Sequence, residues 1–437
     1  MREMKDSGVE WIGEIPKEWS TIPTKRLFKI ESGATPKSEN EAYFNGDIPW
    51  ITPADYKTED VFVSGGRRNI SQLGFESCST TLIPAGSLIF SKRAPIGAVA
   101  INTVDLCTNQ GCLSCISKTS DNVKYYYYTM SICTEQYNLL GSGTTFKEIS
   151  AVNFANFTLV YPPLPEQRRI ADYLDVACSK VDALIANQLS QIEKLKAYKQ
   201  SLITEVVTRG LDPNVPMKDS GVEWIGQIPE GWDVAKQKYH WKNIESGVSV
   251  NAADRPADNE EQYCVLKTSS VSRFVFLPNE YKQVDEEEYG RVSCPVKSNS
   301  IIASRMNTPD LVGACGYVDR DYPNVFLPDR LWQISYREGI IVKYVWYYLI
   351  NKKVRQYISS LSTGTSSSMQ NISQGQFGDI FIAIPTLDEQ QQIADYLDTK
   401  CAKIDALIAI KQQKIEKLME YKKSLIHEYV TGKKEVV

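Results

Sequence analysis

Histidine is scarce in this chain: among its 437 residues there are only two, His240 and His427. Acid–base catalysis by histidine therefore has few candidates. Two phosphate-binding motifs are also missing, the G-x-x-x-x-G-K-[ST] loop and the G-x-G-x-x-G turn followed by a suitable acidic residue. We expect no catalytic residue in this chain, and no cofactor bound by it.

Long apolar runs are absent too. No segment approaches the roughly 18 apolar residues of a membrane-spanning helix, and the opening residues MREMKDSGVEW contain no apolar signal region. The ten cysteines lack the dense spacing of a disulfide scaffold. Cys112 and Cys115 form a C-x-x-C without a second pair or a neighbouring histidine. We therefore expect a cytoplasmic protein with reduced thiols, no membrane association and no metal site.

An excess of positive charge is missing as well. The net charge is −4 and the isoelectric point is about 5.6, which argues against a protein that coats nucleic acid through bulk electrostatics. The net charge does not exclude local patches of basic residues. The length is enough for more than one domain with its own core.

What the chain does contain is a long repeated segment. Residues Leu164–Thr208 return as Leu387–Thr431, and 22 of 34 positions are identical between 170–203 and 393–426. Apolar residues recur at three- and four-residue steps, which predicts two amphipathic helices. About 42 residues would make a rod of roughly 60 Å, which cannot bury its apolar stripe against itself. We expect the two helices to pair as an antiparallel coiled coil through Ile170, Leu174, Val181, Leu184, Leu195, Leu202, Ile393, Leu397, Ile404, Leu407, Leu418 and Leu425.

The whole chain is a tandem duplication. Residues 4–19, MKDSGVEWIGEIPKEW, reappear at 217–232 with 13 of 16 positions identical. The expected organisation is a short motif (1–20), a globular domain (21–160), a long helix (161–210), a second motif (211–233), a second globular domain (234–383) and a second long helix (384–434).

The two globular domains share landmarks but differ in side chains. Glu31-Ser32-Gly33 matches Glu245-Ser246-Gly247, and the strand-like run 87–91 matches 300–304. Each domain is predicted to be α+β. Antiparallel pairing of the two repeated helices would relate the two globular domains by a pseudo-two-fold axis, which matches the pseudo-symmetry of duplex DNA. Because the two domains differ in sequence, the two DNA half-sites that they recognise should differ as well.

The chain resembles the specificity subunit of a type I restriction–modification system. The resemblance covers essentially the full length and rests on three repeated blocks: a block of the type SGVEWIGEIPKEW before each domain, PLPEQRRIADYLD or TLDEQQQIADYLD opening each helix, and DALIA…IEKL within it. It implies two target-recognition domains that read double-stranded DNA, and no catalysis by this chain. It also implies two modification subunits that carry S-adenosylmethionine, and restriction subunits that use ATP and Mg. Tyr161-Pro162-Pro163 only superficially resembles the motif of adenine methyltransferases.

Several polar loop residues are candidates for reading bases, because Arg pairs with guanine and Asn or Gln with adenine. In the first domain they are Lys92, Arg93, Asn109, Gln110, Thr144, Thr145 and Lys147, with Arg67 and Arg68 as phosphate contacts. In the second domain they are Arg305, Asn307, Arg330, Ser366, Ser367 and Gln370. The alternative function is a two-headed scaffold that binds proteins and has no DNA role.

Overall fold

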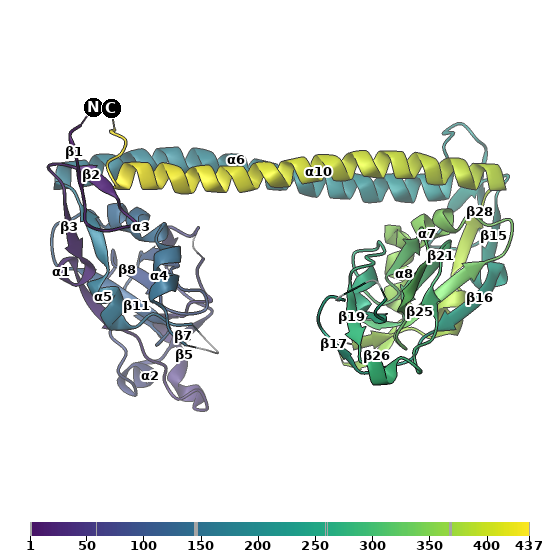
Figure 1. The fold of residues 1–437 in the computed structure, drawn as a ribbon, viewed down its shortest axis with the longest axis horizontal. Helices are drawn as coiled ribbons and strands as arrows, with labels where there is room; N and C mark the ends of the chain where they lie inside the picture. The colour runs from purple at the N-terminus through teal and green to yellow at the C-terminus, as the bar shows by residue number, and fades with distance from the viewer. Residues whose placement is uncertain are drawn as a thin grey trace. The chain divides into compact units, whose positions relative to one another are not determined.

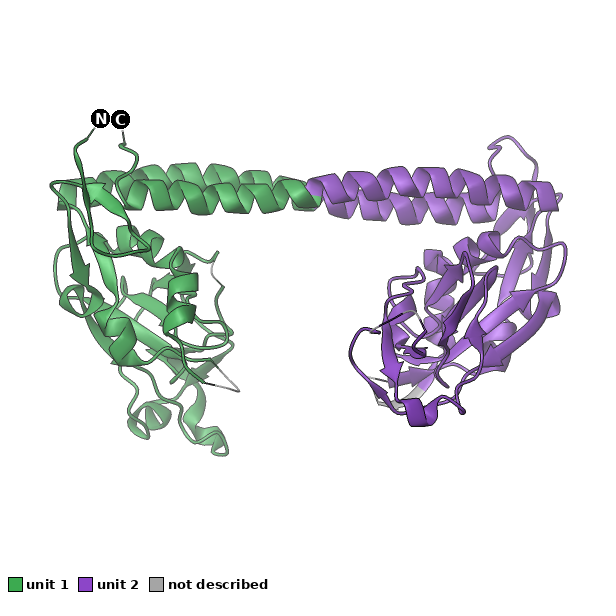
Figure 2. Ribbon diagram, in the orientation of Figure 1, with its two compact units in different colours: residues 1–189, 412–437 green, residues 190–411 purple. Residues whose placement is uncertain are grey.

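The computed structural model describes residues 2–57, 59–143, 147–257, 259, 261–366 and 369–436. The chain forms two compact units, one of residues 1–189 with 412–437 and the other of residues 190–411 (Figure 2). Each unit combines a short motif, a globular domain and part of both long helices. The compact units therefore divide the chain inside the helices, not at the ends of the globular domains.

The first unit contains the following elements before the long helix α6 (Figure 1): β1 (Met4–Asp6), β2 (Glu14–Pro16), β3 (Ser20–Pro23), α1 (Thr24–Leu27), β4 (Phe28–Ser32), η1 (Glu41–Tyr43), β5 (Phe44–Ile51), β6 (Phe62–Val63), β7 (Arg68–Ile70), α2 (Gln72–Glu76), β8 (Leu88–Ser91), β9 (Val99–Asn102), β10 (Cys107–Thr108), β11 (Cys112–Ser117), α3 (Val123–Ser131), α4 (Thr134–Leu140), α5 (Ala151–Asn156) and β12 (Thr158–Tyr161).

The second unit repeats this order with insertions: β13 (Met217–Asp219), β14 (Gln227–Pro229), β15 (Asp233–Lys236), η2 (Gln237–His240), β16 (Trp241–Ser246), β17 (Ala252–Ala253), β18 (Cys264–Leu266), η3 (Thr268–Val271), β19 (Tyr281–Val284), η4 (Glu286–Glu288), β20 (Pro295–Val296), β21 (Ser300–Ser304), β22 (Met306–Asn307), β23 (Cys315–Val318), β24 (Tyr322–Phe326), β25 (Leu331–Tyr336), α7 (Val342–Ile350), α8 (Lys352–Leu361), β26 (Thr363–Ser366), β27 (Met369–Asn371), α9 (Gln374–Gly378) and β28 (Phe381–Ile384). The long helices are α6 (Leu164–Arg209) and α10 (Leu387–Val430).

Each globular domain is built on a mainly antiparallel sheet with one or two further sheets beside it in the strand order. In the first unit the strand orders are β4-β11-β8-β9-β6 and β10-β5-β7. In the second they are β16-β25-β21-β23, β17-β19-β18-β24-β20 and β22-β27-β26. The prediction of an α+β fold with two long paired helices is therefore confirmed.

The helix seam follows the alternating three- and four-residue steps of a coiled coil. Buried Leu174, Cys178 and Val181 mark it in the first unit. In that unit Asp182 pairs with Lys422, and in the second unit Lys199 pairs with Asp405, so the helices run antiparallel.

Leu184 and Leu407, which we expected in the pairing stripe, are instead each 47% exposed. The half-buried seam positions are the next residues, Ile185 and Ile408. The reason is the period: a seam that repeats every 3.5 residues keeps 181, 185 and 188 and leaves 184 at its flank.

The repeated motifs join each globular domain to the helices of its own unit. Trp19 Nε1 donates to Glu166 at the start of α6, and Trp232 Nε1 donates to Glu389 at the start of α10 over 3.0 Å. The neighbouring glutamines Gln167 and Gln390 accept the backbone N–H groups at the beginning of α3 and α7. The identity between the two copies of the motif therefore reflects one structural contact made twice.

The tyrosine-rich helix α3 is part of this junction. Tyr125–Tyr128 are buried, and the Tyr125 hydroxyl donates to the carbonyl of Val430 over 2.7 Å. Asp175 of α6 accepts from both Lys124 and Tyr128. In the second unit Asp398 accepts in the same way from Lys343 and Tyr347.

In the described part of the chain, no helix combines the length and apolar content needed to cross a bilayer.

Candidate nucleic-acid interface

In the first unit, strand ends from distant parts of the sequence meet at one edge of the sheet. Ser91, the last residue of β8, lies opposite Cys112, the first residue of β11. Ser32, the last residue of β4, lies opposite Leu113. Because antiparallel neighbours reverse direction, the loops that follow β8 and β4 and the loop that precedes β11 all emerge at this edge.

Predicted site residues occupy these loops. Lys92 and Arg93 follow β8, and Asn109 and Gln110 precede β11. We call the group formed by these four residues and Glu148 the first edge. Thr35 lies in the loop after β4, and its hydroxyl donates a hydrogen bond to the side-chain oxygen of Gln110.

Glu148 is the acidic member of the first edge, and the sequence did not single it out. Its carboxylate lies 2.8 Å from Lys92 Nζ and 3.7 Å from Arg93 Nη1. The backbone of Arg93 also forms a bridge with that of Glu148. One carboxylate therefore holds two candidate base-reading cations in place.

The remaining candidates of the first domain lie in different surroundings. Arg67 is 79% exposed at its side chain and is 3.7 Å from buried Asp55. The Arg68 guanidinium lies over the Phe44 ring at 3.9 Å, in cation–π contact. Lys147 is exposed. Thr144 and Thr145 lie outside the described residues.

The second unit presents the same edge with other side chains. Ser304, the last residue of β21, lies opposite Leu331, the first residue of β25. Arg305 follows β21, and exposed Asp329 and Arg330 precede β25. Arg305 Nη1 donates to the Asp329 carbonyl over 3.5 Å. We call Arg305, Met306, Asp329, Arg330 and Asn371 the second edge.

Backbone hydrogen bonds make the two edges equivalent residue by residue. The N–H of Lys92 donates to the carbonyl of Gly111 over 3.0 Å, and the N–H of Arg305 donates to the carbonyl of Arg330 over 3.1 Å. The same main-chain contact therefore presents a glycine in one domain and an arginine in the other.

A second pair of hydrogen bonds fixes the other side of each loop. The carbonyl of Lys92 accepts from Ile149 N over 3.0 Å, and the carbonyl of Arg305 accepts from Ile372 N over 3.0 Å. The equivalent positions are Lys92 and Arg305, Arg93 and Met306, Gly111 and Arg330, Lys147 and Gln370, and Glu148 and Asn371.

Asn307 and Gln370 lie opposite each other on β22 and β27. Ser366 ends β26, and Ser367 lies outside the described residues. The side-chain oxygen Oδ1 of Asn371 is buried without a hydrogen-bond partner among the described residues. Where the first edge has a carboxylate between two cations, the second edge has a neutral amide.

Two glycines explain the repeated Glu-Ser-Gly motif. A Cβ on Gly33 would lie 2.1 Å from the carbonyl oxygen of Thr108, and one on Gly247 would lie 1.6 Å from that of Leu327. No side chain fits either place, so the loop after the first sheet strand must approach the opposite backbone closely. Repetition of this motif is the sequence signal that could have identified the edge.

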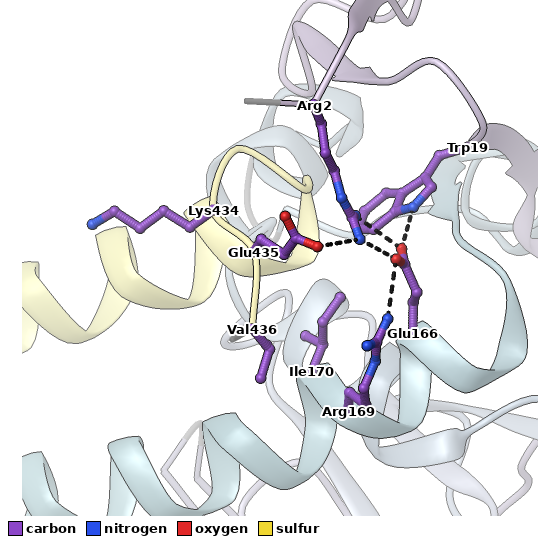
Figure 3. Close-up of a pocket in the computed structure, with 8 residues that line it drawn as sticks. All are labelled: Arg2, Trp19, Glu166, Arg169, Ile170, Lys434, Glu435 and Val436. Carbon is purple, nitrogen blue, oxygen red and sulfur yellow. Dashed lines mark hydrogen bonds and ion pairs between the residues drawn. The ribbon is translucent and has the colours of Figure 1, made fainter.

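A polar cluster at the start of α6 is the junction already described and not a ligand site (Figure 3). Arg2, Trp19 and Arg169 converge on Glu166, and Arg2 also lies 3.2 Å from Glu435. The hydrogen bond to Glu166 raises the pKa of Arg2. The enclosed space is about 10 Å³, room for one water molecule at most.

Metal chemistry has no evident location in the described part of the chain, where no group of three or more His, Cys, Asp or Glu side chains could hold an ion. Burial raises the pKa of the Cys112 thiol to about 12, so this cysteine is a poor source of the thiolate that zinc binds.

A duplicated frame with different polar side chains on equivalent edges is the arrangement of a protein with two recognition domains. The family model for the type I restriction modification DNA specificity domain matches residues 16–194 and 255–420. The chain therefore belongs to this family: it is a non-catalytic DNA specificity subunit of a type I restriction–modification system.

Individual relatives agree with the family match. The chain is 34% identical to the type I restriction enzyme MjaIX specificity subunit of Methanocaldococcus jannaschii over 232 residues, which is 52% of each protein. The match thus spans about half the length of that relative. It is 24% identical to the MjaVIII specificity subunit of the same organism over 96% of this chain and 93% of the other.

The fold is shared with a solved chain from work on complex assembly and conformational transition of the type I R-M system. That chain superposes with a TM-score of 0.68 at 15% identity, over 95% of this chain and 98% of the other.

Proposed function

We propose that each globular domain reads one half of an asymmetric, bipartite site in double-stranded DNA. The first edge, with Arg67, Arg68 and Lys147 beside it, would contact one half-site. The second edge, with Asn307 and Gln370, would contact the other. Helices α6 and α10 each run from one unit into the other without a break. They would connect the two domains that recognise the half-sites.

The observation that supports this proposal is the equivalence of the two edges. Main-chain hydrogen bonds of the same register hold both, while the side chains differ at nearly every equivalent position. A protein that recognises two different short sequences needs this combination: a constant backbone to place the side chains, and different donors and acceptors to choose the bases.

We also propose that two modification subunits, which would carry S-adenosylmethionine, dock on the long helices, and that restriction subunits, which would use ATP and Mg, join that complex. Exposed apolar side chains on both helices support a docking surface, because such residues beside a buried seam are available to a partner. In the first unit they are Val176, Leu184, Leu189, Met419 and Tyr421, and in the second Tyr198, Leu387, Leu407 and Ile410.

The direct test is methylation mapping at base resolution in a methylation-free host that expresses this chain with the modification subunit of its own operon. A single bipartite adenine-methylated motif that disappears when this chain is omitted would support the proposal. Co-purification of the two proteins without methylation would mean that the recognition domains are inactive or that the partner is wrong. Failure of the two proteins to associate would favour the protein scaffold instead.

A substitution at the first edge tests the division of labour. Arg93→Ala removes a cation that Glu148 holds at the surface, and each good bidentate base contact contributes about 1–3 kcal/mol of discrimination. We expect base preference to relax in one half of the motif only. Uniform weakening at all sequences would instead make Arg93 a phosphate contact.

A further inference from the structure

The second edge contains a longer loop than the first. The loop after β21 comprises ten residues from Ser304 to Gly313, and the Gly313 N–H donates to the Ser304 carbonyl over 2.7 Å. The equivalent loop of the first domain comprises seven residues from Ser91 to Gly97 and is closed by the same hydrogen bond over 2.8 Å. Three additional residues therefore project from the second domain.

The additional length forms a tip at residues 308–311. The N–H groups of Leu311 and Val312 both donate to the carbonyl of Thr308 over 2.9 Å, which closes a turn. Thr308 and Asp310 are exposed, whereas Val312 is completely buried. The tip thus has an anchored base and polar side chains that face solvent.

Arg355 of α8 donates hydrogen bonds to the backbone of this tip. Its Nη2 donates to the carbonyl of Asp310 over 3.2 Å and to that of Val312 over 2.6 Å. Its Nε and Nη1 are buried without partners among the described residues, and no described carboxylate forms an ion pair with it. Burial lowers the pKa of Arg355. A guanidinium with two buried nitrogens that lack hydrogen-bond partners is an energetically unfavourable arrangement.

Phe274 supports the arginine from the opposite side. The guanidinium carbon lies 5.0 Å from the centre of the Phe274 ring, in cation–π range. Phe274 has a φ of 60°, a backbone conformation that a bulky residue adopts only when its surroundings force it. Its carbonyl accepts from Trp346 Nε1 over 3.0 Å, which keeps the ring in this position.

We propose that Arg355 is a positioning residue for DNA specificity: it holds the 308–311 tip within the base-reading edge of the second domain. The inference rests on the proposed function, because it assumes that this edge meets DNA. It assigns the exposed Thr308 and Asp310 side chains to recognition of the second half-site. Among the described residues of the first domain, Thr134 lies against Gly97, whereas Ile358 and Arg355 lie against Gly313 in the second.

The test uses the full chain with its modification subunit and the methylation mapping described above. Arg355→Met removes the guanidinium but keeps the length of the side chain. We expect methylation of sites that deviate in the second half to rise about tenfold relative to the cognate site, with the first half unchanged. Arg355→Lys, which keeps a donor near the two carbonyls, should lie between the wild type and Arg355→Met.

Lys352→Met is the matched control, because Lys352 is an exposed cation on the same helix; its motif should equal that of the wild type. Weaker methylation of an unchanged motif in Arg355→Met would reduce Arg355 to a purely structural role and overturn the proposal.

Asp310→Ala keeps the test valid if Arg355→Met does not fold, because it removes only an exposed side chain. It should also change preference in the second half by about tenfold, and an unchanged preference overturns the proposal. Failure of the proposed function is distinguishable, since the wild type would then produce no bipartite motif at all.

Discussion

The two globular domains carry different side chains on the same main-chain framework. At the first edge the Glu148 carboxylate lies between Lys92 and Arg93. At the second edge the corresponding residue is Asn371, and Arg305 is held by the carbonyl of Asp329 instead. The main-chain contacts are the same in both. Under the proposed function, a substitution at the edge would change specificity without any change in the strands that support it.

The largest effect should come from the glycines that both edges need. Gly247→Ala and Gly33→Ala force a Cβ to within 1.6 Å and 2.1 Å of a carbonyl oxygen. We expect each substitution to destabilise its own domain by about 3 kcal/mol or more, and Gly247→Ala to have the larger effect. Each should also abolish recognition of the half-site assigned to that domain. Differential scanning calorimetry measures the first effect.

Gly65→Ala and Gly290→Ala are the controls, because nothing lies within 4 Å of a Cβ at either position. If the four variants unfold at the same temperature, the close backbone approach is not what the motif supplies.

The next effect should be an asymmetric change in specificity. Glu148→Gln removes the charge that holds Lys92 and Arg93, and we expect a shift in first-half preference of about 1–2 kcal/mol with little loss of stability, because the pairs are partly exposed. Methylation mapping checks it. The converse exchange, Asn371→Asp, should alter only the second half, and a change in the opposite half by either variant would contradict the equivalence.

A smaller and symmetric effect is expected at the junctions with the helices. Asp175→Asn and Asp398→Asn each weaken one lysine and one tyrosine contact, and we expect each to cost about 1–2 kcal/mol. Urea unfolding should give similar losses for both. Asp172→Asn, at an exposed position of α6, is the control, and unequal losses would show that the two junctions are not equivalent.

The smallest effect should be a loss of stability in mild acid. Burial lowers the pKa of His427 in the first unit and, with Arg337, that of His240 in the second. The folded state thus favours neutral imidazole, so stability is complete above the ordinary pKa of about 6.5 and falls as the pH drops through the lower folded value. His427→Gln and His240→Gln should each reduce the fall in unfolding temperature between pH 7 and pH 5.

Much of the fold follows from the sequence because it depends on local or repeated patterns. Identity between the two copies revealed the duplication, and the apolar period revealed the two helices. The exposure of Leu184 does not follow from three- and four-residue steps alone, because only a strict seven-residue repeat places position 185 and not 184 in the seam.

The details of the edges could not be read in this way. Glu148 meets Lys92 only after the three strands and two helices between them in the sequence have folded. The role of Arg355 depends on carbonyl groups about 45 residues away. Contacts of this kind arise from tertiary packing, which leaves no period in the sequence.

The division of the chain has a consequence for biosynthesis. The second unit is one continuous stretch, residues 190–411, whereas the first needs residues 412–437 as well. Leu425, Ile426 and Val430 belong to the first core, and Tyr125 donates its hydroxyl proton to the carbonyl of Val430. On the ribosome, the domain that is made first is therefore completed last. A chain that stops at residue 411 would lack this part of the first core and still contain every residue of the second unit.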